Sequence, residues 1–414
     1  MIEWSETHVQ IREMFRRFVD AEVVPKIDDI ELGDTPPYEV LRKMMATFGV
    51  GEMQKSKFFH DLEKEKKRAA TGEPPPEKKK REGFSQEAAD AAAMRVIPIV
   101  EMSKYSPGMI TALGVSVGLT AGAIQRKGTI AQKEKFVPEL LTLEKIGAWA
   151  ITEPGSGSDA FGSMKAVARR DGDGYVLDGQ KTFITNGPYA DTIVFICRLD
   201  DGVAAPDERK VVSFIVDKGT PGLVQSKPLR KMGLHGSPTG ELFLDGVHVG
   251  RDRLIGETED VNARTDAKDT FGSERTGVVA MALGIVERCL ALSTEYARTR
   301  VQFGKPIGEF QLIQLKLAKM EVARMNIQNL LFKQVELAGW GRGLTLAEAS
   351  ASKLYCAQAA MDVCLEAVQL FGGNGYMAEY RVEQLCRDAK VLQIYGGTDE
   401  IQVSQIARAL LWPR

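Results

Sequence analysis

The chain has 414 residues, of which 44% are hydrophobic and 27% are charged, and its formal net charge is −2. These values are typical of a soluble globular protein with two or three domains of about 150 residues each. The near-neutral charge gives no general attraction to nucleic acid or to anionic membranes. No apolar run approaches the roughly 20 residues that a spanning helix needs, and acids appear at once near the N-terminus. We therefore expect no membrane span and no signal peptide.

Cysteine and histidine are few and scattered along the sequence. The five cysteines are Cys197, Cys289, Cys356, Cys364 and Cys386. Their odd number and irregular spacing indicate reduced thiols in a cytoplasmic protein rather than a disulfide framework. The four histidines are His8, His60, His235 and His248. Neither residue type clusters at metal-ligand spacing, which argues against a zinc or iron site.

Residues 1–145 are predicted to form an N-terminal helical domain. Apolar side chains recur every three or four positions from Val9 to Val19, and a second apolar stretch covers 110–124. Between them lies a charged insert at about residues 55–85, which contains the run Pro74-Pro75-Pro76. Such a segment buries too little apolar area to offset its ordering entropy, so we expect a mobile or protruding loop.

The charged insert also permits a more specific interpretation. It could be a contact site for an electron acceptor, a partner protein or nucleic acid, instead of a loop that is merely solvated. The cluster Lys78-Lys79-Lys80-Arg81 is short, is flanked by acids and has no interleaved aromatic residue. That composition argues against nucleic acid, and we prefer the solvated loop.

Residues 146–255 have the composition of a compact β-domain. Two short runs rich in β-branched and aromatic residues, 192–197 and 211–216, are predicted strands. Turns are predicted at 171–174, which reads Asp-Gly-Asp-Gly, and at Asp245-Gly246.

Residues 256–414 return to long helices joined by short loops. Apolar side chains repeat at three and four from Val278 to Leu290, from Leu312 to Val322 and from Leu354 to Val368. Thr398 can cap a fourth helix, with Asp399 and Glu400 in the first turn, where the helix dipole favours acids. We therefore predict an α+β protein that ends in a helical bundle.

Two glycine-rich segments are candidate ligand loops. Residues 149–159 read Trp-Ala-Ile-Thr-Glu-Pro-Gly-Ser-Gly-Ser-Asp, and small residues of this kind let backbone N–H groups approach a ligand closely. An ordinary Gly/Ser turn explains the segment equally well, and no Walker motif is present. Residues 372–375 follow a helical pattern rather than a strand, which excludes a dinucleotide fingerprint and favours a helix C-cap.

The order of the motifs is more specific than any one of them. After 149–159 come the segments 179–187, 231–237, 298–307, 310–311, 369–373 and 393–402. From about residue 137 to the C-terminus, this series resembles the acyl-CoA dehydrogenase family. The resemblance implies an N-terminal helical domain, a middle β-barrel and a C-terminal four-helix bundle. It also implies FAD as cofactor, an acyl-CoA substrate, a role in fatty-acid β-oxidation, a homotetramer built as a dimer of dimers, and an electron-transferring flavoprotein as acceptor.

The resemblance also assigns cofactor contacts to particular positions. Around the isoalloxazine it places Trp149, Ile151, Thr152, Gly157, Ser158, Phe183, Ile184 and Thr185. On the pyrophosphate and adenosine side, contributed by a neighbouring subunit, it places Arg300, Phe303, Gln311, Gln369, Leu370, Gly372 and Gly373. The N-terminus of the last helix, with Thr398, Asp399 and Glu400, would cap the cofactor, as a helix N-terminus suits a pyrophosphate.

The position of the catalytic base departs from the commonest family pattern. Most members have a glutamate directly after the tyrosine that corresponds to Tyr395, and Gly396 occupies that place here. In some relatives, including those that act on isovaleryl-CoA and some long-chain substrates, a Glu-Arg pair opens a helix of the C-terminal domain and supplies the base. Glu274-Arg275 matches that pair, although an acid in the first turn of a helix would be the ordinary explanation of Glu274.

These assignments predict a specific reaction. Glu274 would remove the α-proton of an acyl thioester, and the β-hydrogen would pass to flavin N5 as hydride. The backbone N–H of Gly396 would bind the thioester carbonyl oxygen. Ser158, Arg275, Tyr395 and Gly397 are the predicted substrate contacts. Two other functions fit the same fold: a flavin monooxygenase or oxidase, against which the Glu-Arg pair argues, and a catalytically silent FAD-bearing interaction protein.

Overall fold

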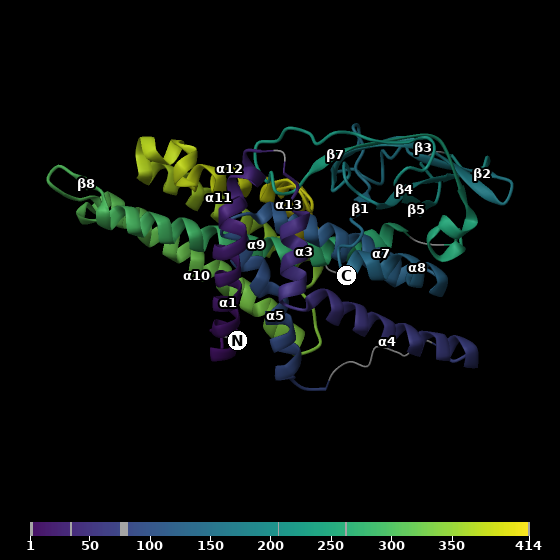
Figure 1. Cartoon of the computed structure of the whole chain (residues 1–414), viewed down its shortest axis with the longest axis horizontal. Coiled ribbons are helices and arrows are strands. Elements are labelled where there is room, and N and C mark those ends of the chain that lie inside the picture. Colours follow the sequence, from purple (N-terminus) through teal and green to yellow (C-terminus); the bar gives the residue numbers. More distant parts are fainter. Residues whose placement is uncertain (1–2, 34, 75–81, 206, 261–262, 413–414) are drawn as a thin grey trace.

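The computed structural model describes the chain except residues 1–2, 34, 75–81, 206, 261–262 and 413–414, and it leaves the side chains of 263–274 undescribed. In the view of Figure 1, a helical N-terminal region and a long helical bundle lie beside a curled sheet. The N-terminal helices are α1 (Glu6–Phe18), α2 (Ile27–Glu31), α3 (Tyr38–Thr47), α4 (Val50–Thr71), α5 (Gln86–Ser103), α6 (Pro107–Leu113), α7 (Ala121–Lys127) and α8 (Ile130–Leu141).

The predicted loop in the charged insert is wrong over its first half. Residues 50–71 form helix α4, whose apolar side chains Phe58 and Leu62 are buried. The burial of these two side chains offsets the cost of ordering the segment, and its charges pair with α8: Lys133 contacts Glu65 at 2.6 Å, and Lys66 contacts Glu134 at 2.5 Å. The helix ends at Gly72, which adopts the left-handed conformation of a C-cap with φ of 69°. Residues 75–81, including the lysine cluster, lie outside the described part of the chain.

The middle of the chain folds into a mixed sheet with its own core. Its strands are β1 (Gly147–Ala150), β2 (Val167–Asp171), β3 (Gly174–Thr185), β4 (Thr192–Asp200), β5 (Val211–Asp217), β6 (Leu223–Gln225) and β7 (Thr239–Gly250). The order is β1-β4-β2-β3-β7-β6, with β5 also paired to β4. Both predicted strands are confirmed as parts of β4 and β5, which are almost entirely buried.

Only one of the two predicted turns joins strands. Residues 171–174 connect β2 to β3, and Gly172 has a φ of 55°. Asp245-Gly246 instead lies inside β7, where the pairing with β3 shifts register between Leu177 and Gly179. The prediction of a turn there was wrong, because a glycine at positive φ serves a β-bulge as well as a hairpin.

The C-terminal region is a bundle of long helices. These are α9 (Ala263–Thr299), α10 (Gln311–Gly339), α11 (Leu346–Phe371), α12 (Val382–Lys390) and α13 (Asp399–Leu411), and a short hairpin of β8 (Val301–Gln302) and β9 (Lys305–Pro306) joins α9 to α10. The N-terminal helix α5 packs against both α9 and α10. The helical bundle is therefore confirmed, and its core is continuous with that of the N-terminal helices.

Two observations qualify the expectations from composition. Among the described residues, Pro107–Lys127 and Arg275–Thr299 are long and apolar enough to cross a membrane, but 50% and 61% of their apolar windows are buried inside the protein. Core helices of water-soluble proteins pass the same test, so this is weak evidence for a span.

The cysteines are less scattered in space than in sequence, because the Sγ atoms of Cys289 and Cys364 lie 3.6 Å apart.

Candidate functional site

The first part of the candidate site is the loop that follows β1. The backbone N–H of Thr182 in β3 donates to the carbonyl of Thr152 at 2.9 Å. The side chain of Lys181 also contacts this loop. Its Nζ donates to the carbonyl of Ile151 at 3.0 Å and lies 2.9 Å from Glu153 Oε1. The fold thus brings the two predicted isoalloxazine segments, 149–158 and 183–185, into one place.

Lys181 and Glu153 form a buried ion pair beneath this loop. Their side chains are 0% and 6% exposed. Burial lowers the pKa of Lys181, and the Glu153 carboxylate opposes that shift. Glu153 is further satisfied by the backbone N–H groups of Lys165 and Ala166, at 2.7 and 2.9 Å. Sequence reasoning missed this pair, because a buried lysine cannot be told from an exposed one in the sequence until its partner is known.

The surface of the loop combines exposed polar groups with an exposed aromatic ring. Gly157 and Ser158 are exposed, whereas Ile151 and Ile184 are buried. Phe183 is 69% exposed and has a φ of 57°, which is uncommon for a residue with a side chain. The strand breaks register with β7 at this point, between Lys181 and Ile184. The backbone is therefore held in a strained conformation that turns a large apolar ring outward.

The second part is the loop that leads into α13. Thr398 caps the helix by accepting a hydrogen bond from the N–H of Ile401 at 3.4 Å, as predicted. Gly396 and Gly397 have φ values of 63° and 91°, which favour glycine. Gln402, which is fully buried, donates from Nε2 to the carbonyls of Gly396 and Gly397 at 3.2 and 2.7 Å.

The predicted cap residues Asp399 and Glu400 have different surroundings. Asp399 Oδ1 lies 3.3 Å from the Nζ of Lys353, a fully buried lysine of α11. Glu400 is solvated, and its own backbone N–H, followed by the Thr398 side chain, lowers its pKa. Asp399 therefore anchors α13 to α11, which sequence reasoning did not anticipate.

Helix α9 contacts the residue that precedes this loop. The hydroxyl of Tyr395 donates to the Sδ of Met281 at 3.2 Å. Arg275 lies two turns earlier on α9, and its side chain is 6% exposed. The side chain of Glu274 lies outside the described residues, but α9 begins at Ala263. Position 274 is thus well inside the helix, and the expectation that the Glu-Arg pair opens it was wrong.

The third group of predicted residues lies around the β8–β9 hairpin. Phe303 is 93% exposed with a φ of 53°, and Arg300 and Gln311 are also exposed. Tyr296 at the end of α9 connects this region to the turn after α11: its ring stacks on Phe371 at 4.1 Å between centroids. Asn374 in that turn donates to the Tyr296 hydroxyl at 3.0 Å. The hairpin and the 369–373 segment therefore lie together.

A single chain does not unite these three groups. Figure 1 shows β8 at one end of the long axis and the sheet, with β2 and β3, toward the other. Along α11, Lys353 and Phe371 are separated by 18 residues, or about 27 Å at 1.5 Å per residue. The β8–β9 hairpin and the 369–373 segment therefore lie apart from the other predicted cofactor segments.

The residues present fit a large planar cofactor that carries phosphates. Phe183 and Phe303 offer exposed aromatic surface, and the N-terminus of α13 offers the helix end that suits a phosphate. Among the described residues, no group that could hold a metal ion is found.

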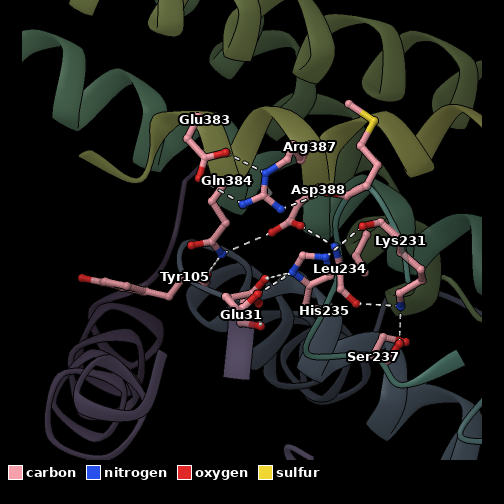
Figure 2. Close-up of polar contacts among 12 residues, drawn as sticks. Glu31, Tyr105, Lys231, Leu234, His235, Ser237, Glu383, Gln384, Arg387 and Asp388 are labelled. Carbon is pink, nitrogen blue, oxygen red and sulfur yellow. Dashed lines mark hydrogen bonds and ion pairs between the residues drawn. The ribbon is translucent and has the colours of Figure 1, made fainter. Parts of the chain in front are cut away.

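A separate polar cluster joins the three regions of the chain. Figure 2 shows Glu31 of α2, His235 of the 231–237 segment and Asp388 of α12 converging. His235 places Nδ1 2.5 Å from the Glu31 carbonyl and Nε2 3.0 Å from the Lys231 carbonyl. Asp388 accepts from the N–H of Leu234, and burial, with Glu31 nearby, raises the pKa of Asp388 to about 7. The histidine thus ties the sheet region to the N-terminal helices and lies apart from the loops described above.

Comparison with known proteins identifies the family. Residues 148–247 match the family description "Acyl-CoA dehydrogenase, middle domain", and residues 265–411 match "Acyl-CoA dehydrogenase, C-terminal domain". A relative from Megasphaera elsdenii, "Acyl-CoA dehydrogenase, short-chain specific", is 40% identical over 76% of this chain and 81% of its own length.

Solved structures agree with the sequence comparison. The butyryl-CoA dehydrogenase of Megasphaera elsdenii has a TM-score of 0.83 at 32% identity, over 99% of this chain and 100% of that one. A glutaryl-CoA dehydrogenase from Mycobacterium smegmatis in complex with FADH2 has a TM-score of 0.82 at 26% identity, over 98% of this chain and 95% of that one. The chain belongs to the acyl-CoA dehydrogenase family.

Proposed function

We propose that this protein is an FAD-dependent acyl-CoA dehydrogenase in which Glu274 removes the α-proton of the thioester. The observation that carries the proposal is the contact between Tyr395 and Met281 at 3.2 Å. Position 274 precedes Met281 by seven residues, which is about two helical turns, so both lie on one side of α9. This spacing supports Glu274 as the source of the carboxylate that Gly396 cannot supply.

The protein groups divide the chemistry between them. An α-proton of a thioester is weakly acidic, so a positioned base must act together with donors on the carbonyl oxygen. Among the described residues, the N–H of Gly396 has no partner within the chain. It can therefore donate a hydrogen bond to the carbonyl oxygen of a thioester. FAD, when bound, supplies the acceptor for the β-hydride; Thr152, Thr185 and Phe183 are the residues that we expect to hold its ring system.

We also propose that the enzyme works as a homo-oligomer, a tetramer built as a dimer of dimers. Arg300, Phe303 and Gln311 border or lie next to the β8–β9 hairpin, which Figure 1 shows at the opposite end of the molecule from strands β2 and β3, so a second copy would have to supply them. The α10 face next to the hairpin supports this, because Leu312, Leu315 and Val322 are 75%, 51% and 57% exposed. These were predicted as packed bundle residues, and a partner would cover them.

An electron-transferring flavoprotein is the acceptor that we propose for the reduced enzyme.

The proposal is tested by anaerobic titration of the purified yellow protein with short, branched and long acyl-CoAs while the oxidised flavin band is monitored. Bleaching by one class supports dehydrogenation and identifies the substrate class. The variant Glu274→Gln should keep its FAD and lose nearly all bleaching, about 10²-fold or more in rate. Bleaching of this variant at the wild-type rate would show that the base lies elsewhere.

A further inference from the structure

The side chain of Gln402 has an unusual set of contacts for a buried glutamine. It lies on α13 and is 0% exposed. Its Nε2 group donates to two successive backbone carbonyls, those of Gly396 at 3.2 Å and Gly397 at 2.7 Å. Both amide hydrogens are therefore used on the loop that precedes the helix.

These two hydrogen bonds fix the orientation of the peptide planes. In a trans peptide the C=O and the following N–H point in opposite directions. Because the carbonyls of Gly396 and Gly397 face Gln402, the N–H groups of Gly397 and Thr398 point away from it. The N–H of Gly396 likewise has no partner among the described residues. The loop thus presents the N–H groups of Gly397 and Thr398 on the side opposite the glutamine, and the same two hydrogen bonds fix the position of Gly396 beside them.

The pair of hydrogen bonds from Gln402 to the carbonyls of Gly396 and Gly397 is called the clamp below, and its atoms are closely packed. A Cβ added at Gly397 would lie 2.8 Å from Gln402 Nε2, closer than side-chain carbons approach. The φ values of 63° and 91° at Gly396 and Gly397 already disfavour other residues. Glycine at position 397 therefore allows the carbonyls to reach the glutamine, in addition to making the turn.

The helix that carries Gln402 is itself held in place. Asp399 is anchored by the buried Nζ of Lys353 at 3.3 Å. Gln358 also donates to Asp399 Oδ2 at 3.3 Å, but from the exposed face of α11. The clamp is therefore attached to a helix that α11 fixes at its first turn.

We propose that Gln402 is a positioning residue for the thioester carbonyl. It holds the 396–398 loop so that the backbone N–H groups face the substrate, and it does not touch the substrate itself. This inference rests on the proposed function, because it needs an acyl thioester whose carbonyl accepts those hydrogen bonds. Donors that stabilise the developing oxyanion act more strongly in the transition state than in the ground state. Loss of the clamp should therefore lower kcat more than it raises KM.

The test compares two glutamines that donate to the same short stretch of chain. Gln402→Met keeps the length of the side chain and removes both donors, and Gln402→Glu gives a second variant with a different effect on folding. Gln358→Met removes the exposed donor to Asp399 and serves as the matched control. For each protein we would measure FAD per subunit, melting temperature, kcat and KM with the acyl-CoA that bleaches the wild type. Exchange of the α-proton of that acyl-CoA with D2O would be followed in parallel.

The expected result is a fall in kcat of at least about tenfold in Gln402→Met, with KM changed less than threefold and FAD content retained. Slower α-proton exchange should accompany it, and Gln358→Met should stay within about twofold of the wild type. Wild-type kcat in Gln402→Met, or a loss of FAD that accounts for all of the lost activity, would overturn the inference alone. If the wild-type protein is bleached by no acyl-CoA, the proposed function fails and the inference fails with it. If both Gln402 variants fail to fold, the residue is structural and the inference is again overturned.

Discussion

Two loops of the candidate site are held from behind by buried side chains, and the two clamps differ in charge. Lys181 holds the carbonyl of Ile151 at 3.0 Å, and its charge is balanced by Glu153 at 2.9 Å. Gln402 holds the carbonyls of Gly396 and Gly397 with a neutral amide. A charged clamp is costly to bury and strongly destabilising to break, whereas a neutral one leaves only unpaired dipoles. The first loop should therefore depend on its clamp for folding, and the second for geometry.

The largest expected effect is on the charged clamp. Lys181→Met leaves the Glu153 carboxylate buried without its counterion, which should lower the free energy of unfolding by about 3–5 kcal/mol. Urea denaturation followed by far-UV circular dichroism would measure it. The double variant Lys181→Met with Glu153→Gln should recover a large part of that loss. Equal destabilisation of the single and double variants would show that charge is not what distinguishes the two clamps.

A pH dependence is expected at the third buried polar centre, where Asp388 lies. Its pKa is raised from 3.8 in the unfolded chain to about 7 in the fold, by burial first and by Glu31 second. Between these values the folded protein binds more protons than the unfolded chain, so the contribution of this group to stability falls as pH rises. The maximum slope is about 1.4 kcal/mol per pH unit for one group.

The variant Asp388→Asn isolates this contribution, because an amide carries no charge at any of these pH values. We expect the variant to gain stability relative to the wild type as pH is raised from 5 to 8, in urea titrations at each pH. The groups that face Asp388 are Glu31, Arg387, the N–H of Leu234 and the side chain of Gln384. A stability difference that stays constant over that range would mean that Asp388 is ionised throughout.

The neutral clamp should have a smaller effect on stability than the charged one. Gln402→Met leaves two carbonyls without their donors and should lower the free energy of unfolding by about 1–3 kcal/mol. The change would be read from the midpoint of the same urea titration. Destabilisation as large as that of Lys181→Met would remove the contrast between the loops.

The smallest effect is expected where the same ion-pair distance occurs on the surface. Lys333 and Glu348 are also 2.9 Å apart, but their side chains are 51% and 43% exposed. Lys333→Met should change the free energy of unfolding by less than about 1 kcal/mol, because water and salt screen the pair. The lysine at that site lowers the pKa of Glu348 to about 2, together with Thr345, and this shift does not translate into stability at such exposure. The difference in unfolding free energy between Lys181→Met and Lys333→Met therefore measures the effect of burial on a lysine–glutamate pair at the same N–O distance.

How far the sequence predicted this molecule depended on whether a signal was local. The strands at 192–197 and 211–216 and the Thr398 cap were visible, because each depends on residue types within a few positions. Helix α4 was predicted as a loop because its charges look solvated along the chain. The residues with which its charges pair, Lys133 and Glu134, lie on α8, about 70 positions further along the sequence.

The candidate site shows the same division. The order of the motifs in the sequence led to the family resemblance. It also showed that Gly396 lacks the carboxylate found there in most members, and it pointed to Glu274 as the candidate base. The supporting side chains Lys181, Lys353 and Gln402 were not anticipated, since a buried polar residue has no signature in a single sequence until its partners are known. Only the tertiary structure could show that Tyr395 contacts α9 and that the β8–β9 hairpin lies at the opposite end of the molecule from β2 and β3. The sequence by itself determined the elements and their chemistry, because those follow from short-range spacing. Which loops meet, and which side chains hold them, was decided by long-range packing, because burial is a property of the folded chain alone.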